Sequence, residues 1–281
     1  MKYTARMPET NVNVTPTSPL REFLILLSGV IAIIVGIYLL LGLALNIIVP
    51  RIPMTFERKL AGPFINSMAS VDRSSEKAQT VQKLLDVIQR RYAKLPYTFT
   101  VYLQESPRVN AVALPGGNIV VFSGLLEKIE SENELASILA HEMGHYVNRD
   151  HLKGVGRALV FMMISAMLLG PDSGAGNLLA QSLNITEMAF SRNQETLADE
   201  FALNALHGTY GHVGGSADFF IKLSKEANTG LWGHYFSTHP ENLKRIAHLK
   251  NYSRIHGFAE KLLRNIPAII TKKGSSPKEL E

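Results

Sequence analysis

Residues 141–145 read His-Glu-Met-Gly-His, a pattern whose side chains can bind and use a metal ion. In an α-helix, residues i and i+4 project from the same face, so the ring nitrogens of His141 and His145 can converge on one zinc ion. Glu142 lies at the flank of this pair, where its carboxylate can take a proton from a water that the zinc activates. The alternative is a surface helix with two solvated histidines, and the flanking residues argue against it.

The residues before the motif specify a helix that can hold two ligands rigidly. Ser131 and Glu134 have the spacing of a capping box, which marks a helix start. Apolar side chains then recur at helical spacing and predict a buried face: Leu135, Ile138, Leu139 and Met143. Small residues stand between them and permit another element to approach closely: Ala136, Ala140 and Gly144. This context favours a zinc site at His141 and His145.

A catalytic zinc site normally has three protein ligands and keeps one position for water. The best third candidate is Glu195, which lies one helical turn before Asp199 and shares its face. Glu195 would bind zinc, and Asp199 could accept a hydrogen bond from a ligating histidine and orient its ring. The alternative is an acidic pair on a solvated helix face. Alanines on this segment would let it lie against the first helix: Ala198, Ala202 and Ala205.

Four ordered motifs resemble the HtpX and CAAX-prenyl-protease group of gluzincin zinc metallopeptidases, peptidase family M48. They are the HExxH helix, the segment 191–199 (SRNQETLAD), the segment 238–246 with its Thr-His-Pro start, and the strand-like region 110–126. Together they cover roughly residues 75 to 255. The resemblance implies one Zn²⁺ per chain on His141, His145 and Glu195, with Glu142 as general base and a polypeptide as substrate.

The resemblance also assigns roles to His239 and Arg245. In some relatives the matching histidine stabilises the transition state or serves as a zinc ligand in a latent state, and the matching arginine supports this region. Judged from the residues alone, His239 stands at a helix entrance, because Pro240 and Glu241 suit a first helical turn.

A strand pair before the zinc helix could align a substrate. Residues 97–103 alternate aromatic and polar side chains, and residues 109–113 and 118–122 flank a Pro-Gly-Gly turn signal. A peptide could add to the edge of such a sheet through main-chain hydrogen bonds. The residues expected to bind it are Asn110, Ala111, Val112 and Ala113. The alternative is a closed structural hairpin.

The segment from Phe23 to Val49 carries no charged side chain and is long enough to cross a bilayer with some tilt. We expect an uncleaved single-pass anchor, because the polar stretch before it is long for a signal-peptide leader. Basic residues flank the span in equal number, three before it and three after it: Lys2, Arg6, Arg21, Arg51, Arg58 and Lys59. Charge therefore does not orient the span, and resemblance to periplasmic and intermembrane-space relatives favours an extracytoplasmic catalytic domain.

Composition bounds the partners. The chain has 281 residues, 46% of them hydrophobic, with a formal net charge of +5 and no cysteine. It can bury one ordinary core without disulfides. The positive charge favours contact with anionic membrane lipid, whereas nucleic acid is excluded as a partner because no basic-aromatic cluster accompanies it. Homo-oligomerisation is left open.

We expect an α+β fold, predominantly α-helical, in which a gluzincin metallopeptidase domain with a small antiparallel sheet follows one transmembrane helix. The expected divisions are a disordered tail (1–22), the transmembrane helix (23–49), a linker (50–74), the peptidase domain (75–265) and a flexible tail (266–281). Residues 155–183 are expected to dip into the membrane surface, to form a lid over the zinc cleft, or to pack in the core.

These features predict a membrane-anchored zinc endopeptidase, with misfolded or misassembled membrane or envelope proteins as substrates by resemblance. The alternative is a latent or non-proteolytic zinc-stabilised assembly factor at the membrane. Glu142 favours the enzyme, because a scaffold has no use for a general base.

Overall fold

A computed structural model describes residues 18–68, 71–92, 95, 97–169, 190–226, 238–239 and 242–271. The chain divides into two compact units, residues 1–44 and residues 45–281, and each is described by itself. The predicted predominantly helical α+β class is confirmed.

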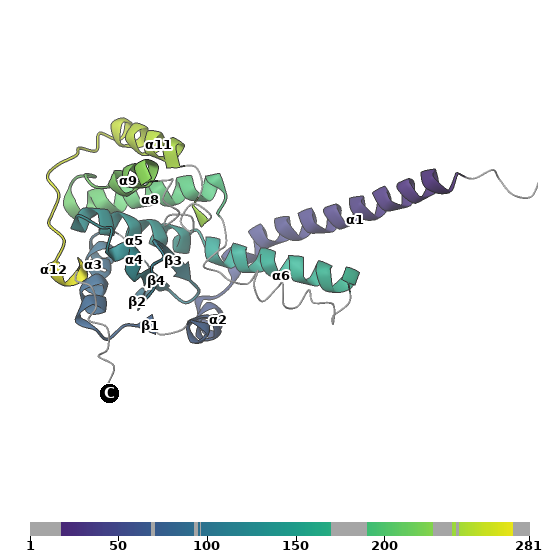
Figure 1. Cartoon of the computed structure of the whole chain (residues 1–281), viewed down its shortest axis with the longest axis horizontal. Helices are drawn as coiled ribbons and strands as arrows, with labels where there is room; N and C mark the ends of the chain where they lie inside the picture. The colour runs from purple at the N-terminus through teal and green to yellow at the C-terminus, as the bar shows by residue number, and fades with distance from the viewer. Residues whose placement is uncertain are drawn as a thin grey trace, which may run out of the picture. The chain divides into compact units, whose positions relative to one another are not determined.

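The first unit is described through helix α1 (Pro19–Ile48), which continues into the second (Figure 1). The second unit contains, in chain order, η1 (Val49–Arg51), α2 (Met54–Ser67), β1 (Val71–Asp72), α3 (Glu76–Tyr92), β2 (Thr100–Gln104), β3 (Ala111–Leu114), β4 (Asn118–Phe122), α4 (Ser123–Leu126), α5 (Glu132–Val147), α6 (Asp150–Leu169), α8 (Arg192–Tyr210), α9 (Asp218–Glu226), α11 (Asn242–Ile255) and α12 (Ala268–Thr271).

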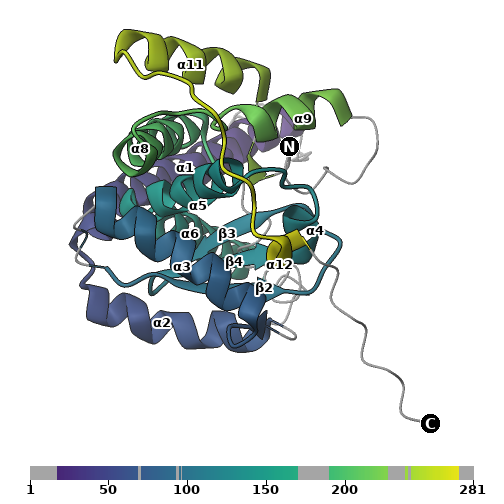
Figure 2. The ribbon, with the colours of Figure 1, turned by 90° about the vertical axis from the view of Figure 1, so that its left-hand side faces the viewer.

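Helix α5, which carries the HExxH motif, lies between the sheet and α8. Figures 1 and 2 agree that α8 and α11 stack on one side of α5 and that the sheet and then α2 follow on the other. Every residue of α5 from Asn133 to Tyr146 is buried. The predicted apolar face is therefore buried, and so is the rest of the helix, because packed elements cover it on both sides. Such a helix holds its ligands in a fixed frame.

The start of α5 departs slightly from the expected capping box. The Ser131 hydroxyl accepts a hydrogen bond from the Glu134 N–H (3.1 Å), as the spacing predicts. The Glu134 carboxylate instead accepts from the N–H of Glu130 (2.9 Å), one residue before the N-cap. It also pairs with Lys222 of α9 at 2.6 Å, so the side chain that caps α5 ties it to a neighbouring helix.

The sheet is mixed, whereas an antiparallel sheet was expected. Its strand order is β1-β2-β4-β3, with β3 antiparallel to β4 as predicted but β2 parallel to β4. The alternation within a strand shows which face is buried but does not encode the direction of its neighbour. Here β4 folds back to lie beside β2, so β3 becomes the edge strand.

The turn between β3 and β4 requires glycine. Gly116 and Gly117 have φ angles of 84° and 83°, in the left-handed region that side chains rarely adopt. A Cβ on Gly117 would lie 2.4 Å from the carbonyl oxygen of Thr98, so the turn also packs directly against the chain that leads into β2. The Pro-Gly-Gly signal therefore forms the tight hairpin that it predicts.

Two regions expected to be irregular contain helices. Residues 50–74, expected as a linker, hold η1 and α2, and Glu57 of α2 is only 1% exposed. Residues 266–271, expected within a flexible tail, hold α12, whose Ile270 is buried in the core that α3 contributes to. In each case a few side chains of the segment are buried, which the composition of the segment did not reveal. The expected N-terminal tail up to residue 17, residues 170–189 and residues 272–281 lie outside the described residues.

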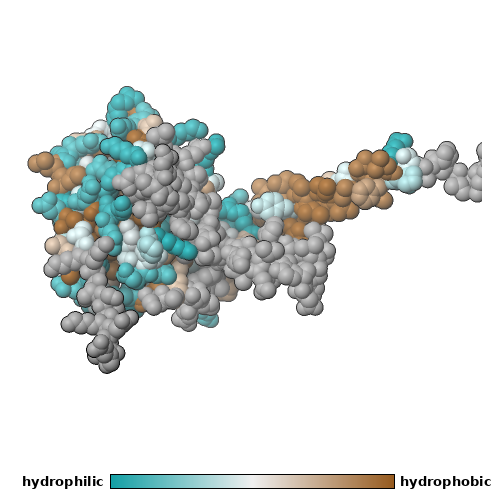
Figure 3. All heavy atoms as spheres, in the orientation of Figure 1, coloured by the Kyte–Doolittle hydropathy of each residue, from teal (hydrophilic) through white to brown (hydrophobic). Residues whose placement is uncertain are grey.

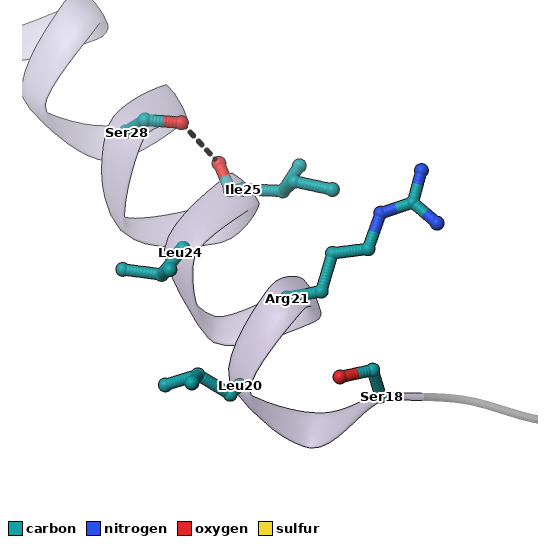
Figure 4. A pocket seen from close by; sticks show the side chains of 6 residues that line it. All are labelled: Ser18, Leu20, Arg21, Leu24, Ile25 and Ser28. Atoms are coloured by element: carbon teal, nitrogen blue, oxygen red, sulfur yellow. Dashed lines mark hydrogen bonds between the residues drawn. The ribbon is translucent and has the colours of Figure 1, made fainter.

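Helix α1 is the one helix in the described part of the chain that is long and apolar enough to cross a membrane, judged by length and composition. Its side chains form an almost continuous apolar surface (Figure 3). Figure 4 shows a hollow beside its first turns, lined by residues of the same helix and by Ser18 just before it. There the hydroxyl of Ser28 donates to the carbonyl of Ile25 (2.8 Å), so this polar group is satisfied within the helix.

Candidate metal centre

Helices α5 and α8 approach each other so closely that glycine is needed between them. A Cβ on Gly144 would lie 2.9 Å from the Cα of Ala198 and 3.1 Å from the Cβ of Phe201. This contact places the first turn of α8 beside the HExxH residues. Gly144 and Ala198, two of the small residues expected to allow a close helix approach, meet at this contact, and Glu195 is brought next to His141 and His145.

Four buried side chains converge on one point: His141, His145, Glu195 and His239. Each offers a ligand atom, and all four atoms lie within 4.8 Å of one another. The Nε2 atoms of His141 and His145 are 3.0 Å apart, and Nε2 of His145 lies 3.4 Å from Oε1 of Glu195. Nδ1 of His239 lies 3.4 Å from Nε2 of His141 and 3.0 Å from Oε1 of Glu195.

These separations fit a tetrahedral zinc ion. With zinc–ligand bonds near 2.0–2.1 Å, two tetrahedral ligand atoms lie about 3.3 Å apart. The donor set also suits the metal, because imidazole nitrogen and carboxylate oxygen are its ordinary ligands together with thiolate. The three residues predicted as ligands and His239 therefore form one group that can hold a zinc ion.

Each HExxH histidine is oriented by a carboxylate on its other ring nitrogen. Nδ1 of His141 lies 3.0 Å from Oδ1 of Asp199, the partner that the sequence suggested. Nδ1 of His145 lies 3.1 Å from Oδ2 of Asp150, a residue that the sequence analysis did not single out. Both contacts place Nδ1–H as donor, which leaves both Nε2 atoms free to face the shared point.

Asp150 was missed because the helix breaks before it. Arg149 has a φ angle of 56° between α5 and α6, so helical spacing from His145 does not extend to the next residue. The break turns Asp150 back toward the His145 ring. The available signal was an acidic residue at the start of the segment that follows the motif, where a turn could return it.

Gln194 of α8 is linked to α5 through Asp150, which contacts His145. Its side-chain oxygen accepts from the Ser191 N–H (2.9 Å) in a capping box at the start of α8. Its side-chain nitrogen donates to Oδ1 of Asp150 at 2.8 Å. The residue immediately before Glu195 is therefore tied to the carboxylate that orients His145, and the ligands on α5 and α8 share one hydrogen-bond network.

His239 is held among the other candidate ligands by its neighbours. The Phe190 N–H donates to the carbonyl of Thr238 (3.0 Å), and the Phe190 ring stacks on His145 with centroids 3.8 Å apart. Nε2 of His239 also lies 3.8 Å from Oε1 of Glu142. This position between Glu195 and Glu142 is compatible with both roles expected from the resemblance.

Arg245 of α11 supports the acidic side chains of the site. It donates to both carboxylate oxygens of Asp199, from Nε at 2.8 Å and from Nη2 at 2.6 Å. Its Nη1 lies 2.5 Å from Oε2 of Glu195, and its guanidinium covers the Phe220 ring at 4.3 Å. A bidentate contact of this kind fixes the Asp199 carboxylate in the orientation that faces His141.

Comparisons with known proteins agree with this geometry. Residues 73–253, more than half of the chain, match the model of Peptidase family M48. The chain belongs to this family. The domain is therefore a zinc metallopeptidase domain, and zinc is the metal that the four-residue group is suited to hold.

Similar proteins include proteases of bacteria and mitochondria. The mitochondrial metalloendopeptidase OMA1 of Arabidopsis thaliana is 34% identical over 53% of this chain and 30% of its own length. The metalloprotease LoiP of Escherichia coli is 27% identical over 66% of this chain and 74% of its own length. A putative beta-barrel assembly-enhancing protease of Vibrio cholerae is 27% identical over 47% of this chain and 29% of its own length. The chain thus spans less than a third of the length of the Arabidopsis and Vibrio relatives.

The electrostatics of the M48 site favour a cation at its centre. Burial raises the pKa of Glu195, but the charges of His239 and Arg245 lower it more, so its net pKa lies well below the ordinary value. Burial lowers the pKa of His145, but hydrogen bonds to Asp150 and Glu195 outweigh this and raise it to about 9. The carboxylates thus stay ionised and stabilise positive charge between the rings, which a bound zinc ion would supply in place of the ring proton.

Glu142 contacts the edge strand of the sheet. Its Oε2 accepts a hydrogen bond from the N–H of Ala113 (2.9 Å). The Phe122 N–H donates to the Asn110 carbonyl, so by alternation Ala111 and Ala113 direct their N–H groups away from β4. Ala111 donates to the side chain of Asn110 (3.0 Å). All four residues expected to align a substrate, Asn110 to Ala113, are buried, although an exposed edge was expected.

Proposed function

We propose that this chain is a membrane-anchored zinc endopeptidase that hydrolyses peptide bonds within polypeptides. His141, His145 and Glu195 are the zinc ligands, and Glu142 is the general base. The observation that carries the proposal is the convergence of the ligand atoms beside a glutamate that bonds to an edge strand. A metal site built for structure alone has no use for that glutamate.

The chemistry follows from the residues around the zinc position. Zinc, when bound, polarises the scissile carbonyl and acidifies the attacking water. Glu142 takes the proton from this water and returns it to the leaving amine. Asp150 and Asp199 hold the two histidine rings, and Arg245 holds Asp199, so the ligands keep their positions as charge develops.

Strand β3 gives the substrate a place and a direction. The outward N–H groups of Ala111 and Ala113 are bonded to side chains, Asn110 and Glu142, in place of another strand. An extended peptide that added to β3 would offer carbonyl groups to these N–H donors and release the Glu142 carboxylate for proton transfer. Main-chain recognition of this kind tolerates many side chains, which suits an enzyme that removes damaged proteins.

His239 gives the site two states in this proposal. Were His239 to serve as a fourth ligand, no position would be left for water and the enzyme would be latent. Were His239 withdrawn, water could bind, and the ring could donate to the oxyanion of the transition state. The 3.0 Å contact between His239 and Glu195 supports the latent arrangement.

The biological role proposed is quality control of misfolded or misassembled membrane or envelope proteins. Two observations support it: α1 is a candidate membrane anchor, and one relative is named a putative beta-barrel assembly-enhancing protease. We place the catalytic domain on the extracytoplasmic side, which is what the resemblance to the family implies. The second candidate is a latent or non-proteolytic assembly factor, which the four-ligand arrangement favours.

The test compares the full chain with Glu142→Gln, both in detergent with one equivalent of zinc. We expect the wild type to cleave casein and Glu142→Gln to be slower by roughly 10²–10⁴-fold, at equal zinc content. Equal activity of the two proteins would remove the protease proposal if His239→Ala is inactive as well, because a latent wild type should gain activity when His239 is removed. His239→Ala separates the states, since a gain in activity supports latency and a loss supports oxyanion stabilisation.

A further inference from the structure

A second buried pair of histidine and carboxylate lies outside the metal centre. Glu57 of α2 and His151 of α6 are 1% and 2% exposed, and Nε2 of His151 lies 2.8 Å from Oε1 of Glu57. Removing a carboxylate from water is costly, and an apolar pair of similar size would often serve stability equally well. The pair therefore needs a reason beyond packing, and its other contacts supply one.

Glu57 is bonded to the turn that ends the edge strand. Its Oε1 accepts a hydrogen bond from the N–H of Gly116 at 3.1 Å. Gly116 lies three residues after Ala113, whose N–H donates to the general base Glu142. A hydrogen bond is directional, whereas apolar packing is not. This bond therefore fixes the position of the β3–β4 hairpin relative to α2.

The same cluster is joined to the end of the zinc helix. The His151 ring stacks on Tyr146, one residue after the ligand His145, with ring centroids 4.7 Å apart and planes at 4°. Arg149, in the break between α5 and α6, donates to the carbonyls of Val49 (3.2 Å) and Ile52 (2.6 Å). The chain after α1 is thereby bound to the zinc helix and to the hairpin.

We propose that Glu57 is a positioning residue for the substrate. Its carboxylate binds the N–H of Gly116, and through the hairpin this bond fixes the position of β3, so that Ala113 faces Glu142. This inference rests on the proposed function, because it takes β3 as the strand that aligns the peptide. Residues 49–57, directly after the candidate anchor, then contribute to substrate positioning in the active site.

The experiment uses the full chain in detergent and four variants. Glu57→Leu removes the acceptor for Gly116, Glu57→Gln keeps an oxygen acceptor without the charge, and Glu57→Asp keeps the charge on a shorter side chain. Lys59→Gln, an exposed neighbour on α2, is the matched control. For each protein we measure zinc content, kcat and KM on a quenched peptide that spans a casein bond cut by the wild type, and amide exchange of residues 111–117.

We expect Glu57→Leu to raise KM about tenfold and to speed exchange in residues 111–117, with kcat within about twofold and one zinc per chain. Lys59→Gln should match the wild type, and Glu57→Gln, which keeps an oxygen acceptor for Gly116 but loses the charge that faces His151, should lie between Glu57→Leu and Lys59→Gln. If Glu57→Leu fails to fold, Glu57→Asp should show the same direction of change, because its carboxylate is too short to hold Gly116 in place.

Two results would overturn the inference. One is an unchanged KM in a folded variant whose exchange is faster, since the turn would then be released without harm to substrate binding. The other is unchanged exchange together with unchanged KM. If neither the wild type nor His239→Ala cleaves the peptide, the proposed function fails instead, and the exchange measurement would still report whether Glu57 holds the hairpin.

Discussion

The metal centre and the Glu57–His151 pair are both buried sets of histidine and carboxylate, yet they are arranged differently. In the metal centre, ring nitrogens of His141, His145 and His239 crowd around one point together with Glu195. In the pair, one ring nitrogen of His151 meets one carboxylate at 2.8 Å, and its Nδ1 has no hydrogen-bond partner among the described residues. The first set shares a centre, whereas the second is a single contact between one ring and one carboxylate.

The difference shows how identical residue types divide into a ligand site and a structural link. The ring nitrogens of His141 and His145 that point away from the centre bond to Asp199 and Asp150, which aims the opposite nitrogens at a common position. Only Nε2 of His151 is engaged by a carboxylate, and that carboxylate continues to a backbone N–H at Gly116. Burial and composition do not distinguish the two sets, whereas the convergence of donors does.

The largest expected effect is loss of zinc, and only a substitution in the metal centre should cause it. His145→Ala should reduce zinc from one ion per chain to nearly none and abolish peptidase activity, because only His141 and Glu195 then remain of the three proposed ligands. His151→Ala is the matched control and should retain one zinc. Metal content of the dialysed proteins measures this, and equal zinc in the two variants would contradict the distinction drawn above.

A smaller effect is expected at the carboxylate that aims His145. Asp150→Asn should weaken zinc binding roughly 10–100-fold, because the ring loses the charge that fixes its orientation and basicity. Competition with a chromogenic chelator measures the affinity, and excess zinc should restore activity. Asp72→Asn is the control, since Asp72 accepts hydrogen bonds from the N–H groups of Ser74 and Ser75 away from the metal centre. Equal affinities in the two variants would remove the orienting role of Asp150.

Disturbing the close contact between α5 and α8 should weaken zinc binding less than loss of a ligand does, but it should lower the stability of the fold. Gly144→Ala would drive a Cβ into Ala198, and we expect a loss of about 1–3 kcal/mol in the free energy of unfolding together with weaker zinc binding. Gly62→Ala is the control, because that position on α2 opens to free space and alanine favours a helix. Thermal unfolding in detergent checks both, and a neutral Gly144→Ala would show that the helices can separate without cost.

The sequence predicted the convergent set well because its spacing lies within helices. His141, His145, Glu195 and Asp199 follow from i, i+4 geometry on two segments, and motif resemblance brought in His239 and Arg245. The parallel pairing of β2 with β4 could not be predicted, since a strand pattern does not state its neighbour's direction. Asp150 was hidden by the backbone break at Arg149.

The Glu57–His151 pair could not be predicted at all. Its members stand 94 positions apart, and neither belongs to a motif with a defined spacing. Glu57 falls in the segment that was expected as a linker, where an acidic side chain is usually solvated, whereas the structure places it in the first turn of α2. Only the packing of α2 beneath the hairpin shows that the carboxylate is buried and bonded. Links of this kind depend on tertiary contacts, whereas a ligand pair on one helix does not.

The smallest predicted effect is a pH dependence of stability that belongs to the pair. Burial raises the pKa of Glu57. The hydrogen bond and charge of His151, together with the hydrogen bonds from Tyr146 and Gly116, lower it by more, so the net pKa lies below 4.5. Below that pH the unfolded chain takes up the Glu57 proton before the folded chain does. The stabilisation is therefore complete above pH 4.5 and is lost as the pH falls through the folded pKa.

Glu57→Gln carries no such proton and isolates this contribution. The thermal midpoint of the wild type relative to Glu57→Gln should hold constant from pH 7 to pH 5 and then fall as the pH drops below 4.5. Loss of zinc at low pH affects both proteins through the same ligands, so it cancels in the difference. A difference that stays flat down to pH 3 would mean that the Glu57 carboxylate does not gain from His151 in the folded state. The pair would then be a neutral contact, and the hold of Glu57 on Gly116 would not depend on its charge.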